Sequence, residues 1–189
     1  MVDQRIQTLL DEAFEHMEKS LEWLRTELHS IRAGRATPAM IDNIRVDYYG
    51  TQTPLNQIAS ISAPQPDLLV VQPWDRSALE AVEKSIQTAN MGLNPSNDGQ
   101  MIRIPVPPLS EERRRELVKS ARSRGEEAKI AIRNIRREIK DRIKKVCDAE
   151  SISEDMRYEG EERLQEITDE FTASVDQMLD RKEAEIMEV

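Results

Sequence analysis

The residues best suited to chemistry in this chain are the lysines and arginines between positions 111 and 147. This segment holds 14 Lys or Arg against 7 Asp or Glu, a net charge of +7, whereas the whole 189-residue chain carries −9. The other segments are acidic, with net charges of −4 for residues 1–30, −1 for 31–110 and −11 for 148–189. Since a surface that serves only solubility mixes its signs, this concentration favours binding to a polyanion.

Helical spacing places these cations beside the buried stripe of a single helix. At about 100° per residue, the apolar side chains cluster within about 60° of Ile132. The stripe comprises Ala121, Ala128, Ile132, Ile135, Ile139 and Ile143. Its flank, about 40° to 140° from Ile132, carries Arg115, Lys119, Arg122, Lys129, Arg133, Arg136, Arg137, Lys140 and Lys144. Glu126 alone interrupts this row, and the pattern leaves two interpretations open: a polyanion-binding face, or a face that is solvated or pairs with acidic neighbouring helices.

Motifs for catalysis are missing from the chain. There is no phosphate-cradling G-x-x-x-x-G-K-[ST] and no dinucleotide-binding G-x-G-x-x-G. The two histidines, His16 and His29, lie about 20 Å apart on one predicted helix and cannot share a metal. The aromatic residues are too dispersed for a single-strand stacking platform. We therefore expect that the protein is not an enzyme and binds no cofactor or metal. The alternative, a hydrolase, would need an active site built from scattered carboxylates.

Two further helices are predicted to pack against the basic one. Apolar residues at steps of three and four define a first helix over residues 3–30 and a last helix that begins at a capping box, Ser151 to Glu154. The first seam contains Ile6, Leu10, Ala13, Met17, Leu21, Leu24, Leu28 and Ile31. The last contains Met156, Leu164, Ile167, Phe171, Val175, Met178 and Ile186. Gly160 lies within this helix, where glycine lowers helix stability without ending the helix. Three such seams predict an elongated antiparallel three-helix bundle.

Between the first two helices lies a region of a different character, rich in proline and in short β-type runs. Strands are predicted around 44–48, 58–62, 68–72 and 101–106, and a helix from a second capping box at Ser77 to about Met91. The fold class is therefore α+β. We expect bundle residues 1–30 and 107–189, with a small α+β domain, 31–106, inserted between them.

Two distinctive connections join these parts. The outgoing one contains Gly34, which permits backbone angles closed to other residues, and the return contains prolines, which restrict φ. A hinge is one interpretation and an ordinary rigid corner is the other. The candidate hinge residues are Arg32, Ala33, Gly34, Pro105, Val106, Pro107 and Pro108.

Composition favours a cytoplasmic protein. The single Cys147 excludes an intrachain disulfide and, without metal-ligand spacing around it, indicates a reducing compartment. No stretch approaches the roughly 18 apolar residues of a membrane span, and the first ten residues lack a signal-peptide pattern. We expect neither export nor contact with a membrane.

Several motifs together resemble the ribosome recycling factor family over essentially the whole chain. They are Ile31 to Ala36, Tyr48 to Gly50 with Pro54 and Leu55, Gly92 to Pro95, Pro105 to Leu109 leading to Glu111 to Arg114, and Arg133 to Arg137. The departures are local: Pro64 to Pro66 in a loop of the small domain, and Trp74 in place of a smaller aromatic residue.

The resemblance implies a monomeric, L-shaped factor that binds the post-termination ribosome and, with the GTPase elongation factor G and GTP, splits it into subunits and releases it from mRNA. It also implies that the basic flank contacts large-subunit rRNA through phosphates and shape. Arg133 is the first candidate contact, with Arg136, Arg137, Lys129 and Arg122 beside it. Arg32, Arg35, Arg113 and Arg114 are second-tier candidates. The alternative function is a coiled-coil adaptor that binds protein through its acidic helices.

Overall fold

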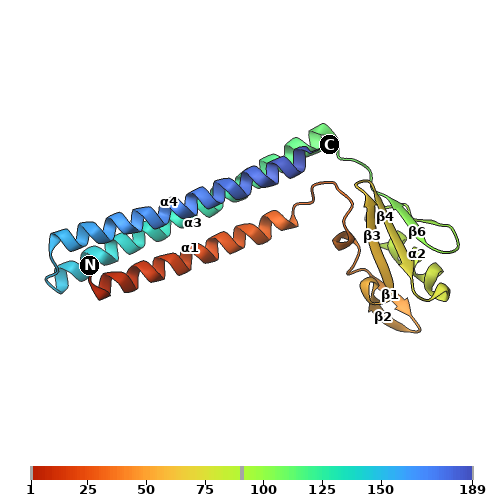
Figure 1. Ribbon diagram of the computed structural model, residues 1–189, viewed down its shortest axis with the longest axis horizontal. Coiled ribbons are helices and arrows are strands. Elements are labelled where there is room, and N and C mark those ends of the chain that lie inside the picture. The colour runs from red at the N-terminus through yellow and green to blue at the C-terminus, as the bar shows by residue number, and fades with distance from the viewer. Residues whose placement is uncertain (1, 90–91, 189) are drawn as a thin grey trace. The chain divides into compact units, whose positions relative to one another are not determined.

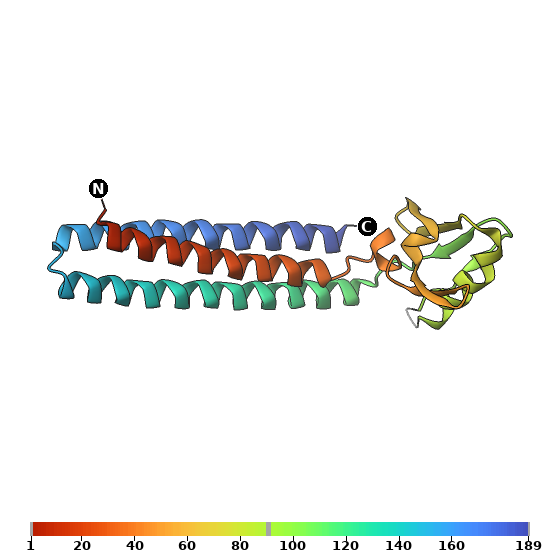
Figure 2. The same ribbon diagram turned by 90° about the horizontal axis from the view of Figure 1, so that it is seen from below.

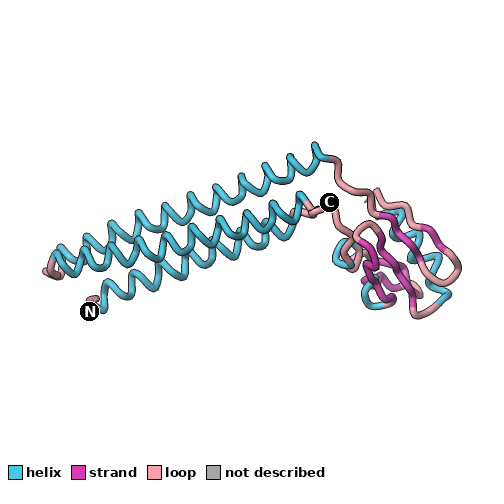
Figure 3. The backbone as a smooth tube through the Cα atoms, turned by 45° about the horizontal axis from the view of Figure 1, so that its top comes forward, coloured by secondary structure: helices cyan, strands magenta, loops and turns pink. Residues whose placement is uncertain are grey.

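The computed structural model describes residues 2–89 and 92–188, which form two compact units. One unit contains the chain up to Ala33 and from Glu111 onward, and the other is Gly34–Ser110. All strands of the described chain lie in the second unit, as Figure 3 shows in magenta. This confirms the α+β class. Two expectations remain predictions: that residues 31–106 form an inserted domain, and that the protein is L-shaped.

The helical unit consists of α1 (Gln4–Ser30), α3 (Glu111–Ala149) and α4 (Glu154–Met187), which lie side by side in Figures 1 and 2. Helix α3 runs against the other two, because its last residues lie near the start of α1 and its first turns lie near the end of α4. Ion pairs from Arg5 to Glu150 and from Arg122 to Glu183 fix these ends. The 39 residues of α3 span about 58 Å.

Helices α1 and α4 each begin at a side chain that accepts a hydrogen bond from a free backbone N–H group. Asp3 accepts a hydrogen bond from the Arg5 backbone at 2.9 Å, and the bonds from Arg5 lower the pKa of Asp3 to about 2. Ser153 caps α4 by accepting from Met156 N at 3.3 Å. The prediction that a capping box starts at Ser151 is wrong, because Ser151 has a φ of 53° and belongs to the turn.

The predicted seams form the core of this unit, although several of their residues are only partly buried or exposed. Ile132, Ile139 and Ile143 are at most 1% exposed, whereas Ile135 is only partly buried. Met156 does not join the seam, since 40% of it is exposed. Gly160 has a packing role that the sequence interpretation missed: a Cβ atom there would lie 2.6 Å from Ile6 Cγ2. Close approach of α1 and α4 therefore requires glycine at this position.

The small unit contains a four-stranded antiparallel sheet of order β3-β4-β6-β5 and a separate β1–β2 hairpin. The sheet strands are β3 (Ala59–Gln65), β4 (Leu68–Pro73), β5 (Ser96–Asn97) and β6 (Ile102–Pro105); the hairpin strands are β1 (Arg45–Tyr48) and β2 (Thr51–Pro54). Strands β2 and β5 were not predicted. The segment expected as a loop at Pro64 and Gln65 instead completes β3, which carries an irregularity after Ser62.

Helix α2 (Leu79–Thr88) buries Leu79, Val82 and Ile86 in the core of the small unit. The predicted capping box at Ser77 is wrong, because Ser77 lies inside a 3-10 turn, Arg76–Ala78, which leads directly into α2. The cap of that turn is Asp75, whose Oδ1 accepts from Ser77 N at 3.0 Å. The predicted helix end at Met91 lies outside the described residues.

Candidate nucleic-acid interface

The basic flank of α3 divides into two rows according to what its side chains contact. The inner row, about 40° to 80° from Ile132, faces α4 and contains Arg122, Lys129, Arg136 and Lys140. Each makes a polar contact with α4: Arg122 Nη2 to Glu183 at 3.0 Å, Lys129 to Asp176 at 2.5 Å, Arg136 to Gln165 at 3.2 Å and Lys140 to Glu161 at 3.4 Å. This row therefore pairs with an acidic neighbour, one of the two interpretations that the sequence left open.

The outer row, about 100° to 140° from Ile132, consists of Arg115, Lys119, Arg133, Arg137 and Lys144. All five residues are exposed. Within the described part of the chain, none of them makes an ion pair with another helix: Arg115 pairs with Glu111, and Arg133 Nη2 lies 2.7 Å from Glu126 Oε1, both within α3. The outer row is thus the part of the flank whose guanidinium and ammonium groups are exposed to solvent without a partner on another described helix.

Cations on the opposite side of α3 bind α1 instead. Arg124 pairs with Glu27 at 2.8 Å and Arg142 with Glu12 at 2.6 Å. The hydrogen bond from Arg142 lowers the pKa of the Glu12 carboxyl, and the bond from Arg122 likewise lowers the pKa of Glu183. Because these side chains are partly exposed to solvent, each pair contributes little to stability. Cations of helix α3 therefore pair with both neighbouring helices, whereas those of the outer row do not.

A shallow hollow of about 480 Å³ opens beside the two rows near the start of α3. Its lining is Arg115, Val118, Lys119, Arg122, Glu183 and Met187. Three cations thus surround one small space, of which Arg115 and Lys119 belong to the outer row. Two of these cations are already paired, Arg122 with Glu183 and Arg115 with Glu111.

The second-tier candidates lie elsewhere. Arg114 is half-buried, and its Nη1 donates to the carbonyl oxygen of Met187 at 3.4 Å, where a cation complements the C-terminal end of α4. Arg113 bonds to Glu116 at 2.8 Å within α3. Arg32 is exposed in the helical unit, and Arg35 belongs to the small unit. The structure therefore does not gather these residues into the outer row.

The two connections meet at Gly34, which has a φ of +79°. A Cβ atom at this position would lie 2.7 Å from Leu109 Cδ1. Both connecting segments are also hydrogen-bonded to the β3–β4 turn. Ala36 N donates to Pro66 O, and Val106 N donates to Asp67 O, each at 2.7 Å. Among the candidate hinge residues, Pro105 completes β6 and Val106 is held by this bond. Pro107 and Pro108 follow the anchored segment.

One side-chain cluster was missed by the sequence interpretation. Tyr48 and Tyr49 make an edge-to-face contact with ring centroids 4.6 Å apart, and Tyr49 OH donates to Asp75 Oδ2 at 2.9 Å. Trp74, which directly precedes Asp75 in the chain, is 68% exposed. The hydroxyl group of Tyr49 therefore links the β1–β2 hairpin to Asp75, next to the exposed Trp74. The available signal was the Tyr49-Gly50 hairpin turn, but its partner Asp75 is far away in sequence.

The described residues offer little for covalent chemistry. No group of three or more His, Cys, Asp or Glu among them could hold a metal ion. Cys147 is buried, and burial raises the pKa of its thiol, which makes a nucleophilic thiolate unfavourable. Within residues 2–89 and 92–188, no helix combines the length and apolar character needed to cross a membrane.

The fold and this surface define a class of binding protein: a three-helix unit with an inserted α+β unit and a cationic row on its central helix. A family profile described as "Ribosome recycling factor" matches residues 24–187. The chain is 59% identical to the ribosome-recycling factor of Salinibacter ruber over 100% of both chains, and 52% identical to that of Carboxydothermus hydrogenoformans over 97% of this chain and 100% of the relative. The chain belongs to the ribosome recycling factor family.

Solved structures agree with this assignment. A solution structure of the ribosome recycling factor covers 100% of both chains at 39% identity, with a TM-score of 0.72. A second match, at 48% identity and a TM-score of 0.61 over 100% of both chains, comes from models for the T. thermophilus ribosome recycling factor and the E. coli elongation factor G bound to the E. coli post-termination complex.

Proposed function

We propose that this protein binds the post-termination ribosome and, together with elongation factor G and GTP, splits it into subunits and releases it from mRNA. Family membership over the whole chain supports the reaction. The observation that supports the mode of binding is the outer row, whose five exposed cations make no ion pair with another helix of the described chain. The place of action is the cytoplasm.

The two rows on α3 have different roles in this proposal. Arg133 and Arg137 of the outer row contact phosphates of large-subunit rRNA, with Lys119 and Lys144 extending the contact along the helix. Guanidinium groups suit phosphate because their planar fork donates two parallel hydrogen bonds. The inner row holds α3 to α4 and contributes mainly to the field around the contact. Binding of this kind reads duplex RNA through its backbone and shape.

The protein itself catalyses no covalent step in this proposal. The chain lacks a nucleotide-binding motif, so GTP is bound and hydrolysed by the partner GTPase. The work of splitting then reaches the subunit interface through the helical unit, whose α3 is about 58 Å long. A helix packed against two others over most of its length bends little under force, which is the property that such a lever requires.

The experiment is light scattering of post-termination ribosomes mixed with the protein, elongation factor G and GTP. We expect a GTP-dependent fall in scattering as subunits separate, and no fall when either the protein or the GTPase is omitted. If scattering stays constant with all components present, the recycling function is wrong. A protein-binding adaptor, the alternative function, would give this result and would bind RNA only weakly.

Variants of α3 test the mode of binding. Arg133→Ala should weaken large-subunit binding by about 1.5 to 3 kcal/mol, the scale of a charge-assisted hydrogen bond. The matched control is Lys145→Ala, because Lys145 is also exposed on α3 but lies about 220° from Ile132, outside both rows. Arg142 is a poorer control, since its loss would leave Glu12 without its partner. Equal weakening by both variants would show that net charge, and not the outer row, determines binding.

A charge swap separates the inner row from the outer row. Exchanging the charges of one pair, with Lys129→Asp and Asp176→Lys in one protein, keeps an ion pair between α3 and α4. Lys129 is only 23% exposed in its side chain, so we expect rRNA affinity to fall by less than for Arg133→Ala. A larger loss in the swapped protein, with its melting temperature unchanged, would place Lys129 in direct contact with phosphate.

A further inference from the structure

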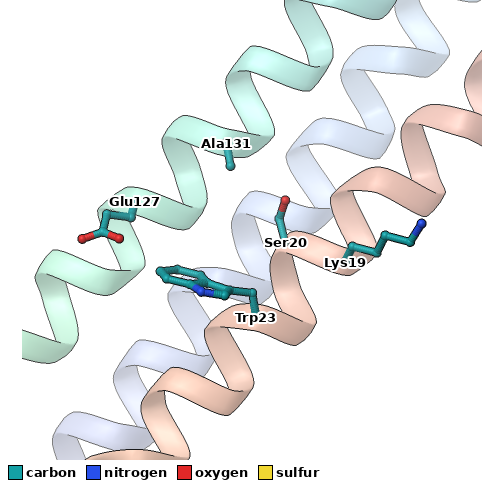
Figure 4. Close-up of a pocket in the computed structure, with 5 residues that line it drawn as sticks. All are labelled: Lys19, Ser20, Trp23, Glu127 and Ala131. Atoms are coloured by element: carbon teal, nitrogen blue, oxygen red, sulfur yellow. The ribbon is translucent and has the colours of Figure 1, made fainter.

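A second surface of α3 has features unlike those of the basic flank. A notch of about 380 Å³, at the small end of the range for ligand pockets, lies between α1 and α3. Its lining is Lys19, Ser20, Trp23, Glu127 and Ala131. Figure 4 shows the Trp23 indole extending from α1 toward α3, opposite successive turns that carry Glu127 and Ala131. These two α3 residues lie about 220° and 260° from Ile132, away from the outer row.

An indole in this position is unusual for a surface residue. Trp23 is 40% exposed, although tryptophan is highly buried on average. Its neighbours in the notch, Ser20 and Ala131, are small and leave the ring accessible from the side of the groove. The notch therefore presents an aromatic surface to a group that enters from solvent.

The unbalanced charge of the notch is negative. The cations near the notch are paired: Lys19 with Glu15 at 3.0 Å and Arg124 with Glu27 at 2.8 Å. Glu127 is exposed and makes no hydrogen bond or ion pair with any residue that the structure describes. An aromatic ring next to an uncompensated carboxylate attracts a cation and repels phosphate.

We propose that this notch binds an arginine side chain from a basic polypeptide segment of a partner protein. The guanidinium plane stacks on the Trp23 indole, and its N–H groups donate to the Glu127 carboxylate. Arginine fits better than lysine because a planar, weakly hydrated guanidinium both stacks and donates in a fork. This contact goes beyond the rRNA interface: the same helix binds RNA on one flank and basic protein on the other.

Intrinsic fluorescence tests the proposal on the full-length chain. The chain has two tryptophans, so Trp74→Phe leaves Trp23 as the sole indole reporter. The probe is a short acetylated and amidated peptide with three arginines spaced by alanines, and the comparison is the same peptide with lysines. We expect a saturable change in Trp23 emission with the arginine peptide and affinity at least about threefold weaker for the lysine peptide.

Two substitutions with the same effect on net charge complete the test. Glu127→Gln should weaken the arginine peptide about tenfold, the scale of one charge-assisted hydrogen bond. Glu126→Gln, one residue away on the basic flank, should leave it unchanged. Equal weakening by both variants, equal affinity for the two peptides, or absence of a saturable signal would each overturn the proposal. A matching emission change with duplex RNA in place of the peptide would also overturn it, because the notch would then bind polyanions.

Discussion

Glu126 is the one acidic residue within the row of cations, and its removal should strengthen RNA binding. Its Oε1 lies 2.7 Å from Arg133 Nη2, and both side chains are about half exposed. A phosphate that binds Arg133 must displace this carboxylate or tolerate it nearby. We therefore expect Glu126→Gln to tighten binding to the large subunit while the melting temperature changes little.

The magnitude follows from two small terms. A phosphate on Arg133 would lie within about 6 Å of the Glu126 carboxylate, and two unit charges at that separation in water repel by about 0.7 kcal/mol. Loss of an exposed intrahelical ion pair adds between about 0 and 1 kcal/mol, because Arg133 no longer has to leave a partner. The sum of about 1 kcal/mol corresponds to about fivefold tighter binding.

Equilibrium binding to isolated large subunits over a series of salt concentrations measures this change. If Arg133 makes a fuller phosphate contact in the variant, the slope of log K against log salt should also steepen, by up to about 0.7 to 0.9 for one added contact. Glu127→Gln is the matched control, with the same change in net charge on the far side of α3. An equal gain in the control, or no gain in Glu126→Gln, would refute the reasoning that Glu126 competes with phosphate.

Three other predictions concern the connection, the core and the cap. Gly34→Val should suppress splitting, measured by light scattering, more than it weakens ribosome binding. The control is Gly99→Val, which has a similar φ of +87° but open space around it and should not suppress splitting. Equal defects in the two variants would show that backbone strain alone causes the loss. Ile139→Ala should cost about 2 to 5 kcal/mol in urea unfolding, more than Ile135→Ala, and should slow splitting below its melting temperature; normal splitting by the folded variant would contradict the lever role. The folded-state pKa of Asp3 is lowered from 3.8 to about 2, so the contribution of this carboxylate to stability is complete above pH 3.8 and is lost as the pH falls toward 2. The melting temperature of Asp3→Asn should therefore fall less between about pH 4 and pH 2 than that of the unchanged protein. An identical pH dependence in the two proteins would show that Asp3 does not contribute to it.

Much of the helical unit follows from sequence because its signals are periodic. The spacing of Ile132, Ile139 and Ile143 identifies the buried face of α3 without knowledge of its neighbours. The caps are less predictable. The capping-box pattern singles out Ser151, which has Glu154 three residues later, but the positive φ of Ser151 places it in the turn, and Ser153 caps α4 although Met156 stands three residues after it. Strand β2 could not be predicted, because Thr51–Pro54 lacks apolar alternation and is defined by its pairing with β1.

The division of the basic flank lies beyond single-sequence reasoning for a related reason. Periodicity assigns Lys129 and Arg133 to the same side of α3, about 40° apart. It does not say that α4 lies close enough for Lys129 to reach Asp176 while Arg133 turns back to Glu126. That distinction depends on where the neighbouring helix packs, which is a property of the folded chain. Sequence therefore predicts a cationic flank, and tertiary packing decides which cations remain for a partner.

Residues 148–189 carry a net charge of −11, and the positions of these acidic residues determine which cations of α3 they neutralise. A uniformly acidic α4 would repel RNA everywhere, but Asp176 and Glu183 are placed where they pair with the inner row. Their negative charge is thus largely compensated along the α3–α4 seam, which allows the outer row beside it to keep a positive field. Acidic residues on the surfaces that face away from α3 still disfavour contact with unrelated RNA. Under the proposed function, we expect both affinity and selectivity for rRNA to depend on which carboxylates are paired within the bundle.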